Sequence, residues 1–191
     1  MGSLAPNEYT TILDVGVSLD VTSFAANFLE QAYPHPHNLT CAGIGSGSAV
    51  LNAYRGVNFV EIAPHKPLPF ADSSFDIVYS NAVVEHVGSR EQQRLFVHEL
   101  CRVGKRVFIT TPNRLFPVEH HTALPLINYF PLSIFRFLLR STRFHFWSNE
   151  SILNPLFAYQ FQRLFPDPSR VKIETRGLGF GPFRSNLVAV L

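Results

Sequence analysis

The sequence has few charged residues, few cysteines and no run of basic residues. Charged residues make up 16% of the 191 positions, and the formal net charge is only +2. This balance gives no reason to expect nucleic acid as a partner. The two cysteines, Cys41 and Cys101, form no CxxC pair. We interpret them as small buried hydrophobic residues in a reducing compartment, and we assign no metal ligands from the sequence.

Targeting and membrane-spanning patterns are also lacking. The first ten residues, MGSLAPNEYT, carry neither a basic region nor an apolar run, and so do not fit a signal peptide. No uninterrupted apolar run reaches the roughly 20 residues that a membrane-spanning helix needs. Hydrophobic residues make up 46% of the chain, enough for a sizeable core. We therefore expect a soluble, cytoplasmic protein with a single domain over 1–191.

The first informative stretch is TTILDVGVS, residues 10–18. A short apolar run that ends at Gly16 predicts a buried strand with a sharp turn at its carboxyl end. Apolar residues at helical spacing follow in 21–33 and indicate a strand-turn-helix unit. Ligands of open α/β sheets bind at such strand ends, so Asp14 and Gly16 are candidate ligand contacts. The alternative is a tight turn in which Asp14 only caps the helix.

Strands and helices alternate along the first part of the chain. After the strand within 10–18, we predict strands at 39–44, 57–62, 75–79 and 107–111, and helices at 21–33, 49–54 and 90–103. This alternation predicts right-handed βαβ crossovers and a mainly parallel sheet. Beyond Asn113 we expect aromatic-rich helical segments at 124–139 and 151–165, then strands at 171–175 and 186–191.

Two motifs resemble a known family. LPFADSSFDIVYSNAVVEHV at 68–87, followed by ELCRVGKRVFITTPN at 99–113, resembles the small type 11 class I S-adenosylmethionine-dependent methyltransferases. TTPNRLFPVEHHTALPLINYFP at 110–131 is similar to a subgroup whose substrates are mostly undefined. The resemblance implies a Rossmann-like α/β sheet, mainly parallel with an antiparallel C-terminal hairpin strand, and helices on both faces. It also implies S-adenosylmethionine as the cofactor.

The resemblance also implies a set of cofactor contacts at the strand ends. They are Asp14, Gly16, Gly43, Ile44, Leu68, Ser80 and Asn81. In this interpretation Gly16 meets the methionine end of the cofactor through its backbone, and Asp14 accepts from the ammonium group. The alternative for Ser80 or Asn81 is a helix cap, and the alternative for Leu68 is a hydrophobic anchor of its loop.

Two acidic residues of the family pattern are missing. Gly45 stands where a carboxylate usually binds both ribose hydroxyls, and Ala63 stands at the usually acidic position near the adenine. Glu61 would replace the acid near the adenine only if the strand register slips, because alternation aims its side chain elsewhere. A hydrogen bond to a charged group is worth about 1.5–3 kcal/mol. We therefore expect cofactor binding to be weaker by about 10- to 100-fold. A binding or scaffold protein without catalysis is thus a second hypothesis; a nicotinamide-binding domain is disfavoured because no GxGxxG follows the first strand.

Methyl transfer from a sulfonium mainly requires positioning and exclusion of water. If the acceptor is a hydroxyl, a base helps to remove its proton, and His121 in the EHHT stretch is our candidate. Its alternative is a loop histidine bonded to backbone. His120 is a weaker candidate, and we interpret Glu85 and His86 of the EHV turn as structural or lining residues.

The most apolar part of the chain is 124–147, LPLINYFPLSIFRFLLRSTRFHFW. It is interpreted either as a cover that walls the acceptor pocket or as an interfacial segment that contacts a membrane. Pro125 and Pro131 would break it into pieces. The acceptor, whether a small molecule, a sugar or a lipid-linked compound, stays open, as does the oligomeric state.

Overall fold

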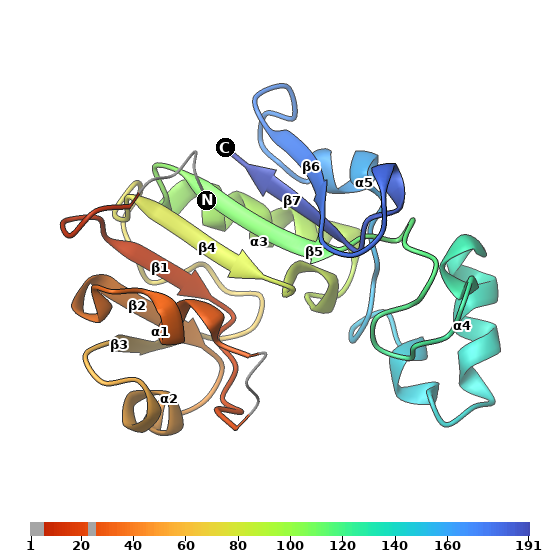
Figure 1. Ribbon diagram of the computed structural model, residues 1–191, viewed down its shortest axis with the longest axis horizontal. Coiled ribbons are helices and arrows are strands. Elements are labelled where there is room, and N and C mark those ends of the chain that lie inside the picture. Colours follow the sequence, from red (N-terminus) through yellow and green to blue (C-terminus); the bar gives the residue numbers. More distant parts are fainter. Residues whose placement is uncertain (1–5, 23–25) are drawn as a thin grey trace. The chain divides into compact units, whose positions relative to one another are not determined.

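The computed structural model describes residues 6–22 and 26–191. Its strands form a seven-stranded sheet with the order β3-β2-β1-β4-β5-β7-β6 (Figure 1). The chain divides into two compact units, one of residues 1–81 with 99–108 and one of 82–98 with 109–191. The predicted fold class, a mainly parallel sheet with an antiparallel C-terminal end, is confirmed. A single domain over 1–191 stays a prediction.

The first unit contains a four-stranded parallel sheet. Its strands are β1 (Ile12–Val15), β2 (Leu39–Gly43), β3 (Asn58–Glu61) and β4 (Ile77–Asn81). β1 lies between β2 and β4, with Asp14 opposite Cys41 on one side and Tyr79 on the other. All four residues of β1 are buried, as its apolar sequence predicts for an inner strand of a parallel sheet.

The helices of the first unit are short. They are η1 (Pro36–Asn38), α1 (Phe28–Ala32) and α2 (Ser48–Ala53). In the described residues a helix runs only over Phe28–Ala32, so the helix predicted at 21–33 is too long. Residues 23–25 of that prediction lie outside the described residues. Asn27 precedes α1 in a left-handed conformation, with φ 56°. Its side-chain amide also exchanges two hydrogen bonds of 2.8 Å with the backbone of Ser18, which ties this residue to the loop after β1.

The second unit combines helical segments with an antiparallel hairpin. Its first elements are η2 (Val84–His86), α3 (Arg90–Val103, as far as His98) and β5 (Val107–Pro112, from Ile109). Later elements are η3 (Ile127–Tyr129), α4 (Leu132–Arg140), η4 (His145–Ser148), α5 (Ala158–Gln162), β6 (Lys172–Arg176), η5 (Gly181–Phe183) and β7 (Asn186–Val190). β6 and β7 pair antiparallel, with Lys172 opposite Val190. This confirms the expected C-terminal hairpin.

The helices predicted at 124–139 and 151–165 are shorter than expected. Leu126 adopts a left-handed φ of 61° and Pro131 precedes α4, so the first segment breaks into η3 and α4. In the second segment the Asn154 backbone N–H donates to the Glu85 carbonyl at 2.8 Å. The Arg90 guanidinium binds the Pro155 carbonyl at 2.7 Å. Backbone groups engaged in this way are not available to an α-helix, which starts only at Ala158.

The aromatic part of the second unit has its own small core. Ile127, Phe135, Leu139 and Leu153 are buried together, and Trp147 packs against them. On the opposite side of α4, Phe137 is 70% exposed, and Ile134 and Leu138 are exposed as well. Among the helices in the described part of the chain, none is both long and apolar enough to cross a membrane.

Candidate functional site

The carboxyl ends of β1, β2 and β4 meet at one edge of the parallel sheet. Gly16, Ile44 and Asn81 follow or end these strands, and all three are exposed. Gly16 has a φ of 99°, and its N–H donates to the Ala42 carbonyl at 2.8 Å. Glycine adopts this conformation without strain, so the turn can present its backbone to a ligand. The structure thus brings together three of the predicted cofactor contacts.

Asp14 lies behind this turn in a buried acidic cluster. Its carboxyl is paired with that of Glu30 in α1, and both side chains are buried. Burial first, and the negative charge of Glu30 second, raise the pKa of Asp14 well above its usual range. The Cys41 thiol donates to Glu30 Oε1 at 3.3 Å. Glu30 Oε2 has no hydrogen-bond partner within the described residues, so this cluster would gain from a nearby cation.

Three further predicted contacts are buried and already engaged. The Ser80 hydroxyl donates to the Val15 carbonyl at 2.8 Å and joins β4 to β1. A side chain at Gly43 would meet Val17 Cγ1 at 3.1 Å. The Leu68 N–H donates to Glu99 Oε2 at 2.8 Å. These residues shape the strand ends, and their direct contact with a cofactor stays a prediction.

Gly45, at the position where the family resemblance predicts a ribose-binding carboxylate, carries no side chain. Gly45 has a φ of 90°, a conformation that side-chain-bearing residues rarely adopt, so the chain is shaped here for glycine. The exposed residue Glu61 ends β3 and lies opposite Gly43 in the strand register. Glu61, on the neighbouring strand β3, therefore places a carboxylate close in register to Gly45.

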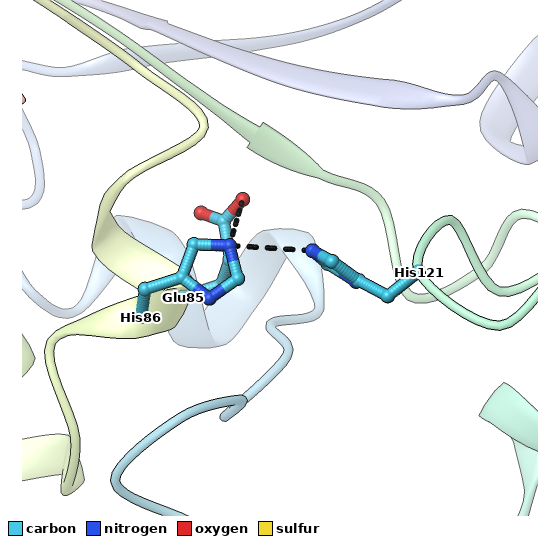
Figure 2. A group of neighbouring side chains, drawn as sticks. All are labelled: Glu85, His86 and His121. Atoms are coloured by element: carbon cyan, nitrogen blue, oxygen red, sulfur yellow. Dashed lines mark hydrogen bonds and ion pairs between the residues drawn. The ribbon is translucent and has the colours of Figure 1, made fainter. Parts of the chain in front are cut away.

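A second group of polar side chains lies in the second unit (Figure 2). Glu85 and His86 come from η2, and His121 comes from the loop after β5. The Nε2 atoms of the two imidazoles are 3.2 Å apart, and Glu85 Oε1 is 3.8 Å from His86 Nε2. A small hollow beside them is lined in part by Glu85, Glu119 and His121.

Each member of this group is held by another residue. His121 Nδ1 is 2.8 Å from Glu119 Oε1, and His86 Nδ1 is 2.6 Å from the Ile152 carbonyl. The Thr111 hydroxyl donates to Glu85 Oε2 at 2.9 Å. The indole ring of Trp147 lies 4.5 Å from the His121 ring, centre to centre. The geometry is thus fixed from several elements of the second unit.

The carboxyl groups of this site differ in charge state. Burial raises the pKa of Glu85 to about 7, against the opposing hydrogen bond from Thr111. Burial also acts to raise the pKa of Glu119, but hydrogen bonds from His121 and Thr122 outweigh it and lower the pKa. Burial lowers the pKa of His86. Glu119 is therefore a carboxylate at neutral pH, and it holds a proton donor on His121.

The sequence analysis missed part of this arrangement. Glu119 was not selected, although its place two residues before His121 was a signal for an orienting carboxylate. Glu85 and His86 were interpreted as structural, yet they lie directly beside the candidate base. His120 packs its ring against Phe116 and also lines the small hollow beside the group.

With this geometry known, comparison with protein families is informative. Residues 17–107 match the family model described as "Methyltransferase domain". This stretch, slightly less than half of the chain, therefore resembles a methyltransferase domain. The match runs from Val17, after β1, to Val107, the first residue of β5, and so includes Ile44, Leu68 and Asn81. The family implies S-adenosylmethionine as its cofactor.

Solved structures show the same fold at low sequence identity. An S-adenosylmethionine-dependent methyltransferase from Mesorhizobium loti aligns with a TM-score of 0.58 and 15% identity, over 99% of this chain and 94% of that one. An O-methyltransferase family protein from Burkholderia thailandensis aligns with a TM-score of 0.61 and 14% identity, over 100% of this chain and 52% of that one. The structure "PigF with SAH" aligns with a TM-score of 0.57 and 16% identity, over 98% of this chain and 59% of that one. This chain therefore spans about three fifths of that protein. No curated protein matches the sequence.

The strand ends of the first unit fit part of this cofactor. The exposed turn at Gly16 and the carboxyl groups of Asp14 and Glu30 behind it suit a positively charged methionine end. The unpartnered oxygen on Glu30 adds to the negative potential there. Beside the end of β2, Glu61 supplies a carboxylate opposite Gly43 in the strand register, whereas Gly45 carries no side chain.

Proposed function

We propose that this protein transfers the methyl group of S-adenosylmethionine to a hydroxyl of a small-molecule, sugar or lipid-linked acceptor. The observation that carries the proposal is the exposed edge formed by Gly16, Ile44 and Asn81 in a sheet of the matched family. When bound, S-adenosylmethionine supplies an electrophilic methyl group on a sulfonium centre. A cytoplasmic location is part of the proposal, because the cofactor is made inside cells. Both cysteines, Cys41 and Cys101, are free thiols, which suits a reducing compartment.

The residues that would hold the cofactor divide by task. Gly16 and Asn81 offer polar groups at the exposed strand ends, and Ile44 offers an apolar surface there. Asp14 would accept a hydrogen bond from the ammonium group, whose positive charge would favour ionisation of the buried carboxyl pair. Gly43, Leu68 and Ser80 would keep the walls in place through the contacts described above.

His121 is the proposed base for the acceptor hydroxyl. Glu119 is ionised and accepts the Nδ1 hydrogen of His121 at 2.8 Å, which leaves the Nε2 lone pair of the neutral ring to accept a proton. The carboxylate also stabilises the imidazolium that forms. Glu119 is thus a positioning residue for His121.

A second function, binding without catalysis, is favoured by one observation. Gly45 stands where the ribose carboxylate belongs, in a backbone conformation that disfavours any side chain. Without that anchor the cofactor would bind weakly, and the fold could serve a partner instead.

Isothermal titration with S-adenosylmethionine and S-adenosylhomocysteine separates the two functions. Micromolar binding by the wild-type protein supports the methyltransferase, and absence of heat at millimolar cofactor contradicts it. Glu61→Gln tests the substitute anchor, with Glu8→Gln, an exposed carboxylate near the amino end, as the matched control. A loss of about tenfold in affinity in Glu61→Gln alone would assign the ribose contact to Glu61.

The exposed aromatic surface of 124–147 is the proposed contact with a membrane that presents a lipid-linked acceptor. Ile134, Phe137 and Leu138 of α4 are exposed, and Arg140 and Arg143 beside them are exposed cations. Liposomes with anionic lipid should sediment the wild-type protein and release the Phe137→Ser variant. Wild-type protein that stays in the supernatant would end this part of the proposal.

A further inference from the structure

The two histidines of the second unit face each other through the same type of nitrogen. The Nδ1 partners are the Glu119 carboxylate, which also accepts from the backbone of His121 and from Thr122, and the Ile152 carbonyl, at 2.8 and 2.6 Å. Both partners only accept hydrogen bonds, so both Nδ1 atoms carry the hydrogen. In neutral rings both Nε2 atoms then carry lone pairs, and these atoms are 3.2 Å apart. Two facing lone pairs repel unless a positive group lies between or beside them.

Glu85 adds a buried oxygen to the same point. Its side chain is 1% exposed, and Oε1 has no hydrogen-bond partner among the described residues. Oε1 is 3.8 Å from His86 Nε2, which is beyond hydrogen-bonding distance. A proton shared between the two imidazoles would relieve their repulsion but would leave Oε1 unsatisfied. A cation bound to all three atoms satisfies each of them.

The distances suit a tetrahedral metal site. Ligand atoms about 2.0–2.2 Å from a tetrahedral zinc ion lie roughly 3.3 Å from one another. The two Nε2 atoms are 3.2 Å apart, and the three ligand atoms all lie within 4.8 Å of one another. Glu85 Oε1 is 3.8 Å from His86 Nε2, somewhat longer than this spacing. Figure 2 shows the three side chains directed toward one another.

The surroundings also resemble those of a built metal site. Metal-bound histidines usually donate their other nitrogen to a carboxylate or a carbonyl, and here Glu119 and Ile152 supply both. The Thr111 hydroxyl holds the second oxygen of Glu85 at 2.9 Å. These contacts come from three separate positions in the unit, so the ligand atoms are oriented in advance.

We propose that Glu85, His86 and His121 bind one divalent transition-metal ion of the zinc class, through Oε1 and the two Nε2 atoms. Two imidazoles and one carboxylate suit zinc better than magnesium, which prefers oxygen ligands. Three protein ligands leave a fourth position for water or an acceptor oxygen. Metal binding does not depend on the proposed methyl transfer. In the metal-loaded protein His121 is a ligand, and its Nε2 is no longer free to act as a base.

The chain contains its own reporter for this site. Trp147 is the single tryptophan of the sequence, and its ring lies 4.5 Å from His121 and 6.1 Å from His86. Untagged protein stripped with a chelator is titrated with Co²⁺, while Trp147 fluorescence and the visible absorption of tetrahedral Co²⁺ are recorded. We expect saturation at one equivalent, competition by Zn²⁺, and no response to Mg²⁺.

Variants assign the response to the three ligands. His86→Ala should weaken Co²⁺ binding by at least about 100-fold, and Glu119→Gln by about 10- to 100-fold. His120→Ala is the matched control, because its ring packs on Phe116, and it should bind as the wild type does. Circular dichroism establishes that each variant is folded.

Two results would overturn the metal site. The first is a folded wild-type protein that shows no saturable quenching and no visible band at stoichiometric Co²⁺. The second is a His86→Ala variant that binds as tightly as the wild type. Cofactor titration of the metal-stripped protein is a separate measurement, so failure of the metal site and failure of the proposed methyl transfer are distinguished.

Discussion

The two units of the molecule bury acidic side chains in opposite ways. In the described residues, the first unit buries Asp14 and Glu30, and the second buries Glu85 and Glu119. Asp14 and Glu30 lie side by side with no basic residue between them, and the pKa of Asp14 rises. Glu119 instead accepts four hydrogen bonds, from the backbone and side chains of His121 and Thr122.

This difference indicates what each unit requires from a ligand. A pair of buried carboxyls without a counterion is most stable when it holds a proton or meets a cation, as a cofactor ammonium group would provide. A carboxylate that is fully hydrogen-bonded needs no further partner and can orient a neighbour. Glu85 lies between these cases, with one oxygen bound by Thr111 and the other unpartnered.

The largest expected effect is on turnover in the second unit. His121→Ala removes the proposed base, and general-base catalysis is worth about 10²- to 10⁴-fold. With an acceptor that the wild-type protein methylates, we therefore expect the turnover of His121→Ala to be lower by about that factor. Its affinity for S-adenosylmethionine should change less than twofold. Release of S-adenosylhomocysteine and calorimetry measure the two quantities.

His120→Ala is the control for this prediction. It removes the adjacent imidazole but leaves the pairing of Glu119 with His121 intact. Unchanged turnover in His121→Ala would remove this residue from the mechanism, whether as a base or as a metal ligand.

The next largest effects are opposite changes in stability in the two units. Glu119→Gln loses charge-assisted hydrogen bonds from His121 and Thr122, so the free energy of unfolding should fall by about 1–3 kcal/mol. Glu30→Gln keeps an acceptor for the Cys41 thiol and removes the charge that opposes ionisation of Asp14. It should raise the free energy of unfolding at pH 8 by about 1 kcal/mol.

The sign of the Glu30→Gln effect depends on pH. The folded protein holds the Asp14 proton more tightly than the unfolded chain does, so its stability falls as pH rises from the usual aspartate pKa through the raised one. Tyr79 and Cys41, which also face Asp14, titrate only at higher pH because burial raises both pKa values. Denaturant unfolding at pH 4 and pH 8 should therefore show a larger gain at pH 8. An equal gain at both would contradict the account.

Much of the fold could be predicted from local patterns. The helix at 90–103 is observed with its predicted bounds, because its apolar residues repeat at helical spacing. The segment 151–165 could not be predicted, because Asn154 and Pro155 give their backbone groups to distant partners. Periodicity in the sequence carries no information about such long-range hydrogen bonds.

The site shows the same limit. Gly16 and Asn81 could be selected because strand ends and family motifs mark them. The meeting of His86 and His121 joins residues 35 positions apart. The unpartnered oxygen of Glu85 is a property of packing alone. The sequence therefore pointed to a candidate base, and the structure adds the groups around it.

The smallest expected effect concerns an acidic residue of the first unit that does have a counterion. Asp76 accepts from Lys105 Nζ at 2.8 Å and from the backbone and hydroxyl of Thr11, which hold its pKa at about 2. Its contribution to stability is present above the usual aspartate pKa and is lost as pH falls from there through about 2. Because solvent screens the partly exposed pair, Asp76→Asn should cost about 1 kcal/mol at pH 7 and flatten acid unfolding below pH 4. Asp72→Asn removes a highly exposed partner of Arg102 and should change neither the stability at pH 7 nor the acid unfolding profile. Equal acid unfolding profiles for wild type and Asp76→Asn would show that the Lys105 counterion does not stabilise Asp76, and the contrast with the Asp14 pair would be lost.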